Sequence, residues 1–322
     1  MQFYMAPMEG LTGYIFRNAY EKHYGGIARY FTPFLTNKKM NHRERNDILP
    51  EHNRGMEVVP QVLTNRADDF CCIAGRLREY GYERVNLNLG CPSGTVVAKN
   101  RGAGFLAFPE ELDAFLDEIF SRCTSRISIK TRIGRDAPAE WERLLAIYEK
   151  YPLEELIIHP RVQKDFYKNQ VNLDAYGVAE RMSRHELCYN GDICTVEDYQ
   201  ARRKRFPGTE RVMLGRGLLK NPDLIGEIQN SENTQEQQER HLPKEEGHRK
   251  IRLRAFHDDI LAGYQAVMSG DRATLFKMKE LWVYLGERFP DSEKYLKKIK
   301  KTERIREYET IVDALFRERE LR

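Results

Sequence analysis

Short apolar runs, rich in β-branched residues, recur along the first two thirds of the chain, and a stretch with helical spacing follows most of them. Such alternation is typical of parallel β-α units. Eight runs within about 230 residues favour an α/β fold with a closed (β/α)₈ TIM barrel over an open doubly wound sheet. An open sheet would also be expected to carry a G-x-G-x-x-G turn after its first strand, where this chain reads APMEG. The predicted strands are residues 2–5, 28–34, 57–63, 84–89, 127–131, 156–159, 187–190 and 211–214, and the predicted helices include 13–24, 66–80, 109–122, 139–150, 196–205 and 222–229.

The alternation ends near residue 229, and the polar segment NSENTQEQQERHLPKEEGH follows at 230–248. Because it is nearly free of apolar residues, this segment is predicted to be a linker or a domain boundary. Helical apolar spacing then returns at 249–269 and 271–289, and 292–322 has the pattern of one or two further helices. We therefore predict a barrel domain over 1–235 and a small all-α domain over 236–322. A long polar loop is predicted at 36–55.

Composition narrows the class of protein. Of the 322 residues 41% are hydrophobic and 32% charged, and no run approaches the ~18 apolar residues of a membrane span. The start MQFYMAPMEG lacks the basic and apolar segments of a secretory signal, so we expect a cytoplasmic protein. The six cysteines show no paired metal-ligand spacing, and we expect reduced thiols and no metal site.

The positive charge is concentrated at one end of the chain. Residues 241–322 hold 19 Lys and Arg against 15 Asp and Glu, which accounts for the whole net charge of +4. This distribution fits a polyanionic partner that contacts the last quarter of the chain. It also fits an ordinary solvated helical surface, which is the simpler interpretation of charge alone.

Polar side chains stand at most of the predicted strand ends, where (β/α)₈ barrels carry their active sites. Buried lysine, histidine and amide side chains need partners, which a ligand in the barrel mouth would supply. The seventh and eighth ends, NGD and GRG, fit the phosphate site common after these strands, and each also fits an ordinary turn. These strand-end residues are Pro7, Met8, Glu9, Gln61, Asn88, Lys130, Arg132, His159, Arg161, Asn190, Gly191, Asp192, Gly215 and Arg216.

Cys91 lies between Gly90 and Pro92, just past the fourth predicted strand. Three roles remain open for it: nucleophile, general acid or buried filler. A nucleophile needs an adjacent base, and none is close in sequence. A general acid needs only reach and a protonated thiol, which an ordinary cysteine has at neutral pH. The position alone favours filler, as it does for Cys71, Cys72, Cys123, Cys188 and Cys194.

Taken in order, these motifs resemble the tRNA-dihydrouridine synthases, a family of flavin-dependent RNA-modifying enzymes. The matching segments APMEGLTGYIFR, NLNLGCPSGTVVAKNRGAGFL, IKTRIG, HPR, YNGDI and VMLGRGLLKNP span nearly the whole chain. The resemblance implies an FMN-binding barrel followed by a helical tRNA-binding domain. It also implies NADPH-driven reduction of tRNA uridines to 5,6-dihydrouridine, by hydride transfer from flavin N5 to uracil C6. We expect a monomer, because the basic surface is assigned to tRNA.

Residue roles follow from the same resemblance. Cys91 would protonate uracil C5. The implied flavin contacts are Pro7, Met8, Glu9, Gln61, Lys130, His159, Asn190, Gly191, Asp192, Gly215 and Arg216, and the implied substrate contacts are Asn88, Lys99, Arg101, Arg161, Lys297, Lys298 and Lys301.

The chain departs from the family pattern at three places. Gly13 stands where Asp is common, Pro160 stands where the sixth strand end usually has glycine, and the loop CPSGTVV lacks a frequent lysine. Two alternatives remain open. One is an FMN barrel that acts on a free pyrimidine, which would not need the basic helical segment. The other is a non-catalytic tRNA-binding protein on a flavoenzyme scaffold.

Overall fold

The computed structural model describes residues 1–36, 39–234 and 243–322. The chain forms two compact units. The first consists of Met1–Pro7, Ile27–Asp192 and Gln200–Leu214, and the second of Met8–Gly26, Ile193–Tyr199 and Gly215–Arg322. The predicted boundary between residues 235 and 236 lies outside the described residues, so the division into 1–235 and 236–322 stays a prediction.

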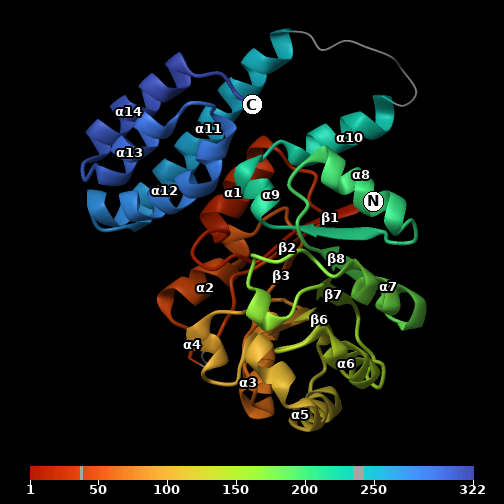
Figure 1. Cartoon of the computed structure of the whole chain (residues 1–322). Coiled ribbons are helices and arrows are strands. Elements are labelled where there is room, and N and C mark those ends of the chain that lie inside the picture. The colour runs from red at the N-terminus through yellow and green to blue at the C-terminus, as the bar shows by residue number, and fades with distance from the viewer. Residues whose placement is uncertain (37–38, 235–242) are drawn as a thin grey trace. The chain divides into compact units, whose positions relative to one another are not determined.

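The first unit contains the predicted parallel barrel (Figure 1). Neighbouring strands follow the order β3-β2-β1-β9-β8-β7-β6-β5-β4, and the two strands at the ends of this order are consecutive in the chain. Only Pro60, which has no N–H to donate, separates β3 (Val58–Val59) from β4 (Gln61–Val62). The two short strands therefore act as one strand, and the ring closes with eight members. The prediction of a (β/α)₈ barrel is confirmed.

The remaining strands lie close to the predicted runs. Their inward side chains form a core of Tyr4, Ala6, Phe31, Val59, Ile157, Cys188 and Met213. Parallel strands buried on both faces read as continuous apolar runs, which is why the sequence pattern locates them. The strands are β1 Gln2–Met5, β2 Arg29–Phe31, β5 Arg84–Leu89, β6 Arg126–Arg132, β7 Leu156–His159, β8 Leu187–Asn190 and β9 Arg211–Leu214.

Helices follow the strands, and three of those in the first unit, α2 (His42–Ile48), α4 (Gly94–Val97) and α7 (Leu173–Met182), lie outside the helical ranges named in the sequence analysis. Within the expected polar loop at 36–55, Asn41 and Glu44 form a capping box that starts α2. Helix α7 was not among the named ranges either, and the Asn172 side chain caps its N-terminus. The other helices of this part are α3 Ala67–Glu79, α4 Gly94–Val97, α5 Pro109–Arg122, α6 Trp141–Tyr148 and α8 Val196–Arg205, with the 3₁₀ turns η1 Pro50–His52, η2 Gly102–Ala107, η3 Pro138–Glu140 and η4 Gln163–Asp165.

The second unit is helical. The rings of Phe16 and Phe256 meet edge to face at 5.4 Å, which joins the first helix of the chain to α11. The Tyr308 hydroxyl accepts the Trp282 indole N–H at 2.7 Å inside the C-terminal helices. The helices are α1 Tyr14–His23, α9 Arg216–Lys220, α10 Leu224–Thr234, α11 Pro243–Val267, α12 Asp271–Leu285, α13 Glu293–Lys301 and α14 Ile305–Glu318, with η5 Gly286–Arg288.

The linker expected at 230–248 is wrong at both of its ends. Helix α10 runs to Thr234 and α11 starts at Pro243, while 235–242 lie outside the described residues. Glutamate, glutamine and lysine are good helix formers, so a segment with few apolar residues can still extend a helix. Across the described part of the chain, no helix has the length and apolarity needed to span a bilayer.

Candidate active site

A chain of side-chain hydrogen bonds links three neighbouring strands, β4, β5 and β6. Gln61 on β4 donates to Asn86 Oδ1 at 2.7 Å, and Asn86 on β5 donates to Ser128 Oγ on β6 at 2.8 Å. Asn88 Nδ2 donates back to Gln61 Oε1 at 2.7 Å. Side chains two residues apart on a strand share a face, so β5 directs both asparagines to the same side. The register then places Lys130 of β6 opposite Asn88.

The same asparagine fixes the backbone that carries Cys91. Asn88 Oδ1 accepts the N–H groups of Gly90 and Cys91 at 3.0 and 2.9 Å. On the other side, the Ala103 N–H donates to the Cys91 carbonyl at 3.1 Å. Gly102 has φ +55°, and a Cβ there would lie 2.9 Å from the Cys91 carbonyl oxygen, so only glycine fits. The glycine-rich stretch after Cys91 forms the packed turns α4 and η2 instead of an open loop.

Arg132 anchors two loops, a role that sequence analysis did not assign to it. Its guanidinium donates to three backbone carbonyls, which belong to Gly90 at 3.1 Å, Val162 at 2.8 Å and Phe166 at 2.7 Å. It also lies over the Tyr167 ring, 5.4 Å from the centroid. A buried arginine at the end of β6 therefore joins the Cys91 loop to the loop after β7. The signal in the sequence was the second cation of IKTRIG, two residues beyond Lys130.

The electrostatics of the site set the protonation of Lys130 and Cys91. Burial, and then the Arg132 charge, lower the pKa of Lys130 to about 8. Its ammonium makes no hydrogen bond or ion pair with any residue that the structure describes. Burial raises the pKa of the Cys91 thiol, against the opposing effects of a Ser93 backbone hydrogen bond and the Lys130 and Arg132 charges. At neutral pH the thiol is therefore protonated, which favours a general acid over a nucleophile.

Around β7 and β8, Arg161 holds two predicted flavin residues together. Its Nη1 lies 3.0 Å from both His159 Nε2 and Asp192 Oδ1, and its Nη2 pairs with Asp192 Oδ2. Its Nε donates to the Asn169 carbonyl at 2.6 Å. Arg161 is only 2% exposed, and each of its guanidinium nitrogens has a partner. The predicted contact between Arg161 and the substrate stays a prediction.

The other predicted residues are more dispersed. Pro7 follows β1, and Asn190 at the end of β8 donates to the Met213 carbonyl at 2.8 Å. A Cβ on Gly191 would lie 3.0 Å from Val171 Cγ1, so this turn requires a small residue. Lys99 is exposed and Arg101 is half-buried. The flavin contacts predicted in the second unit are Met8 and Glu9 in a turn, Gly215 before α9 and Arg216 as the first residue of α9, and these roles stay predictions.

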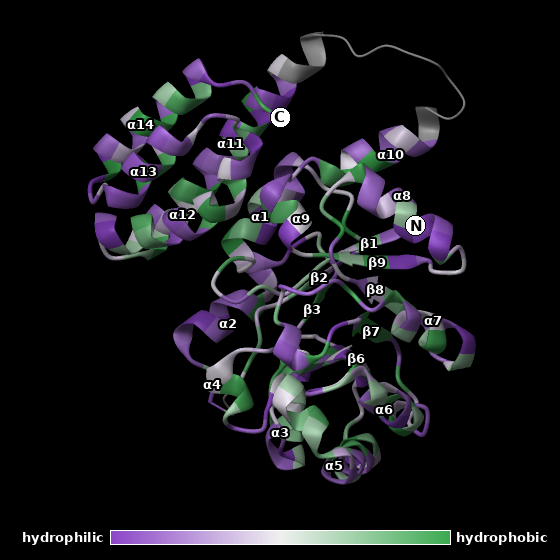
Figure 2. Cartoon of the chain, in the orientation of Figure 1, coloured by the Kyte–Doolittle hydropathy of each residue, from purple (hydrophilic) through white to green (hydrophobic). Residues whose placement is uncertain are grey.

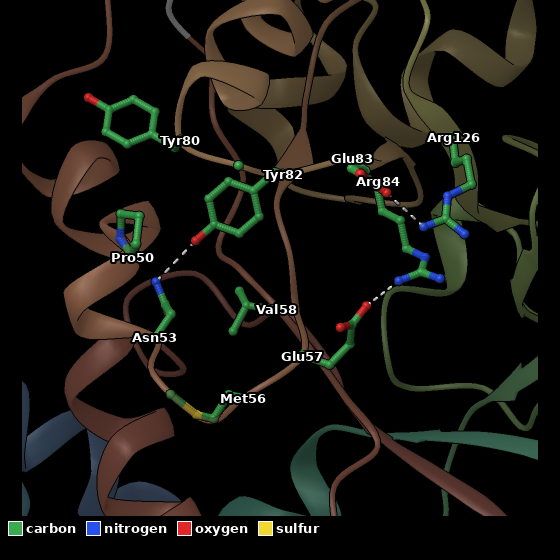
Figure 3. A pocket seen from close by; sticks show the side chains of 11 residues that line it. Pro50, Asn53, Met56, Glu57, Val58, Tyr80, Tyr82, Glu83, Arg84 and Arg126 are labelled. Atoms are coloured by element: carbon green, nitrogen blue, oxygen red, sulfur yellow. Dashed lines mark hydrogen bonds and ion pairs between the residues drawn. The ribbon is translucent and has the colours of Figure 1, made fainter.

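A cavity of about 320 Å³ opens at the opposite, amino-terminal ends of β3, β5 and β6 (Figure 3). Its charged side chains are paired: Arg84 with Glu57 at 2.5 Å, and Arg126 with Glu83 at 3.4 Å. Because barrels of this kind act at the carboxyl ends of their strands, we do not assign the chemistry to this cavity. No cluster of three metal-ligating side chains occurs among the residues that the structure describes.

The Asn88 contacts predict a measurable loosening of the Cys91 loop. In Asn88→Ala the two N–H donors of Gly90 and Cys91 lose their acceptor, which should cost about 1–3 kcal/mol of unfolding free energy in urea. We also expect faster alkylation of Cys91 by iodoacetamide in the native protein. Ser128→Ala, which removes a hydrogen bond one step further from the loop, is the control. Equal alkylation rates in both variants would contradict the anchoring role.

Comparison with known proteins agrees with this geometry. A family model described as dihydrouridine synthase matches residues 4–317. A tRNA-dihydrouridine(16) synthase of Pseudomonas putida is 30% identical over 234 residues, which are 70% of this chain and 72% of that protein. One from Pseudomonas syringae pv. tomato is 27% identical and covers 91% of this chain and 92% of its own length. The solved structure of a mutant of morphinone reductase in complex with tetrahydroNAD has a TM-score of 0.51 at 12% identity, covers 71% of this chain and 86% of its own, and supports the fold alone.

Proposed function

The chain belongs to the dihydrouridine synthase family, and on that premise we propose that it reduces specific uridines of tRNA to 5,6-dihydrouridine. The observation that carries the proposal is the position of Cys91, which Asn88 holds at the barrel mouth beside Lys130 and whose pKa burial raises. A thiol held in this state can give a proton.

We propose FMN as the cofactor and NADPH as the reductant. The Lys130 ammonium fits an anionic ring, because it is desolvated and has no hydrogen-bond partner among the described residues. Beyond its side-chain hydrogen bonds to Asn86 and Asn88, the Gln61 amide retains one N–H and one lone pair. The proposed flavin contacts are Pro7, Met8, Glu9, Gln61, Lys130, His159, Asn190, Gly191, Asp192, Gly215 and Arg216.

When bound, FMN would supply the hydride that reaches uracil C6. The carbon C5 then needs a proton, and the Cys91 sulfur holds one at neutral pH. Lys130 offers positive charge where negative charge develops, and Arg132 keeps the Cys91 loop in place through Gly90. The target base must leave its stack to reach such a site, as in other enzymes that act on bases.

The lysines of α13, whose ribbon is largely hydrophilic in Figure 2, form the proposed contact with the tRNA backbone. Tyr295 and Ile299 are buried on one side of this helix, while Lys297, Lys298 and Lys301 are exposed on the other. These three lysines have no ion pair within the part of the chain that the structure describes. Unpaired cations are free to replace the counterions of a polyanion. The further proposed contacts with the substrate are Lys99, Arg101 and Asn88. The Asn88 amide already bonds to Gln61, Gly90 and Cys91, so only its remaining hydrogen-bonding capacity would be available to the substrate.

Neutralising this face should weaken tRNA binding in a salt-dependent way. In the triple variant Lys297→Gln, Lys298→Gln and Lys301→Gln, loss of three phosphate contacts should reduce the slope of log K against log salt by about 2–3. The control removes three lysines of the first unit, Lys150, Lys164 and Lys204, by the same substitution. Binding is measured by fluorescence anisotropy with labelled tRNA between low and physiological salt. An unchanged salt slope in the α13 variant would show that these lysines do not contact the tRNA phosphates.

The function itself is tested with purified protein, NADPH and unmodified tRNA or free uracil. We expect a yellow protein with a flavin band near ~450 nm and dihydrouridine in tRNA only. Turnover of free uracil without activity on tRNA would favour a free-pyrimidine enzyme, and colourless protein that binds tRNA would favour a non-catalytic role. Since two of the relatives are named for uridine 16, that position is the first to map. We propose a cytoplasmic monomer without a metal ion.

A further inference from the structure

Two thiols meet on the outside of the barrel, away from the residues of the candidate active site. Cys71 lies on α3 and Cys123 directly follows α5, and their sulfur atoms are 2.8 Å apart. Both side chains are half-buried, so a small oxidant can reach them. The two cysteines are separated by 52 positions in the chain, and only the fold brings them together.

Three other contacts hold the same two elements in register. The rings of Phe70 and Phe115 meet edge to face at 6.3 Å, and Arg122 pairs with Asp68 at 2.9 Å. Arg78 also donates to the Thr124 hydroxyl. The thiols therefore stay opposed even when neither takes part in a bond. Closing the gap to the ~2.05 Å of a disulfide needs a movement of less than about 1 Å.

The surroundings distinguish the two sulfurs. The Cys123 S–H donates to the Cys71 sulfur, and burial, followed by this hydrogen bond, raises the pKa of Cys123 to about 12. The Arg122 guanidinium interacts electrostatically with both thiols. Because Cys71 accepts the hydrogen bond, we assign the first attack to Cys71 and the second step to Cys123.

We propose that Cys71 and Cys123 are a thiol-modification site that forms a reversible disulfide with hydrogen peroxide as the oxidant. The Cys71 sulfur attacks one peroxide oxygen, which gives a sulfenic acid and releases one water. The Cys123 sulfur then displaces the sulfenic hydroxyl, which forms the S–S bond and releases a second water. Two thiols are oxidised by two electrons, and one peroxide is reduced to two waters.

The bond would clamp α3 to the end of α5 and close a ring of chain that contains Cys91. A cross-link over this many residues restricts the unfolded chain more than the folded one, so it should raise thermal stability. Cys188 is fully buried, so an oxidant reaches it less easily than the half-buried Cys71 and Cys123.

Peptide mapping tests the proposal directly. The full-length protein is treated with a slight excess of hydrogen peroxide, its remaining thiols are alkylated, and it is digested with trypsin without reductant. We expect the peptides ADDFCCIAGR (67–76) and CTSR (123–126) as one disulfide-linked species that dithiothreitol separates. Because Cys72 lies in the same peptide, the Cys72→Ser variant assigns the bond and serves as the matched control. It should form the linked species at the wild-type rate.

Cys123→Ser should lose the linked species, and its melting temperature should not rise on oxidation as that of the wild type does. A link through Cys72, sulfinic acid at Cys71 without a link, or no loss of thiols in the wild type would each overturn the proposal. Peptide mapping of the wild type needs no variant, so the proposal can be contradicted even if a substituted protein fails to fold.

Discussion

Replacing Cys91 by alanine should lower the rate of dihydrouridine formation by about 10²–10⁴-fold, the contribution typical of a positioned general acid. The loop that carries residue 91 should keep its conformation in this variant, because the hydrogen bonds that hold it involve the main chain of Cys91 and not its side chain. Asn88 bonds to the Cys91 N–H, and the Ala103 N–H bonds to the Cys91 carbonyl. The rate is measured by mass spectrometry of nucleosides from tRNA that has been incubated with enzyme and NADPH.

The controls for this variant separate proton donation from binding. Flavin content and tRNA affinity should stay at wild-type levels in Cys91→Ala, and Cys72→Ala, which removes a thiol from helix α3, should keep full activity. Because burial raises the pKa of Cys91, wild-type activity should hold through neutral pH and decline only at alkaline pH, where the thiol ionises. Wild-type rates in Cys91→Ala would mean that another group gives the proton.

The barrel was accessible from sequence because its strands are buried on both faces and therefore read as apolar runs. Helix α2 was not, because its start depends on the capping box of Asn41 and Glu44 and not on an apolar stripe. The break at Pro60 could not be predicted, because the sequence indicates one continuous strand at 57–63. Only strand pairing shows that β3, before the proline, pairs with β2, and that β4, after it, pairs with β5.

Within the candidate site, the sequence placed polar residues at strand ends but did not tell ligand contacts from supports. Arg161 and Arg132 both lie at the barrel mouth, and both bond to other groups of the chain: Arg161 to Asp192 and Arg132 to the Phe166 carbonyl. The roles of such side chains depend on loops that fold back from far along the chain, as Phe166 does toward Arg132. The opposed thiols of Cys71 and Cys123 likewise required the packing of two helices.

Replacing Lys130 by methionine should stabilise the flavin-free protein at neutral pH while reducing its activity. Burial lowers the pKa of Lys130 from 10.5 to about 8, so the folded state keeps a desolvated ammonium at pH 7. Removing it should raise the unfolding free energy by about 1–3 kcal/mol, as the size of the shift indicates. The loss of positive charge beside the reacting ring should slow dihydrouridine formation by about 10²-fold or more.

The pH dependence of this gain has a definite sign. Between pH 8 and 10.5 the unfolded chain binds more protons at this lysine than the folded protein does, so wild-type stability receives a contribution that rises with pH. Lys130→Met lacks this contribution, and its advantage in urea unfolding should shrink across that window and vanish above it. Lys204→Met, which removes an exposed lysine of α8, should change neither stability nor activity. A Lys130→Met protein that is less stable than wild type at pH 7 would show that the ammonium has a stabilising partner in the folded chain, and the assignment of its charge to a bound flavin would then fail.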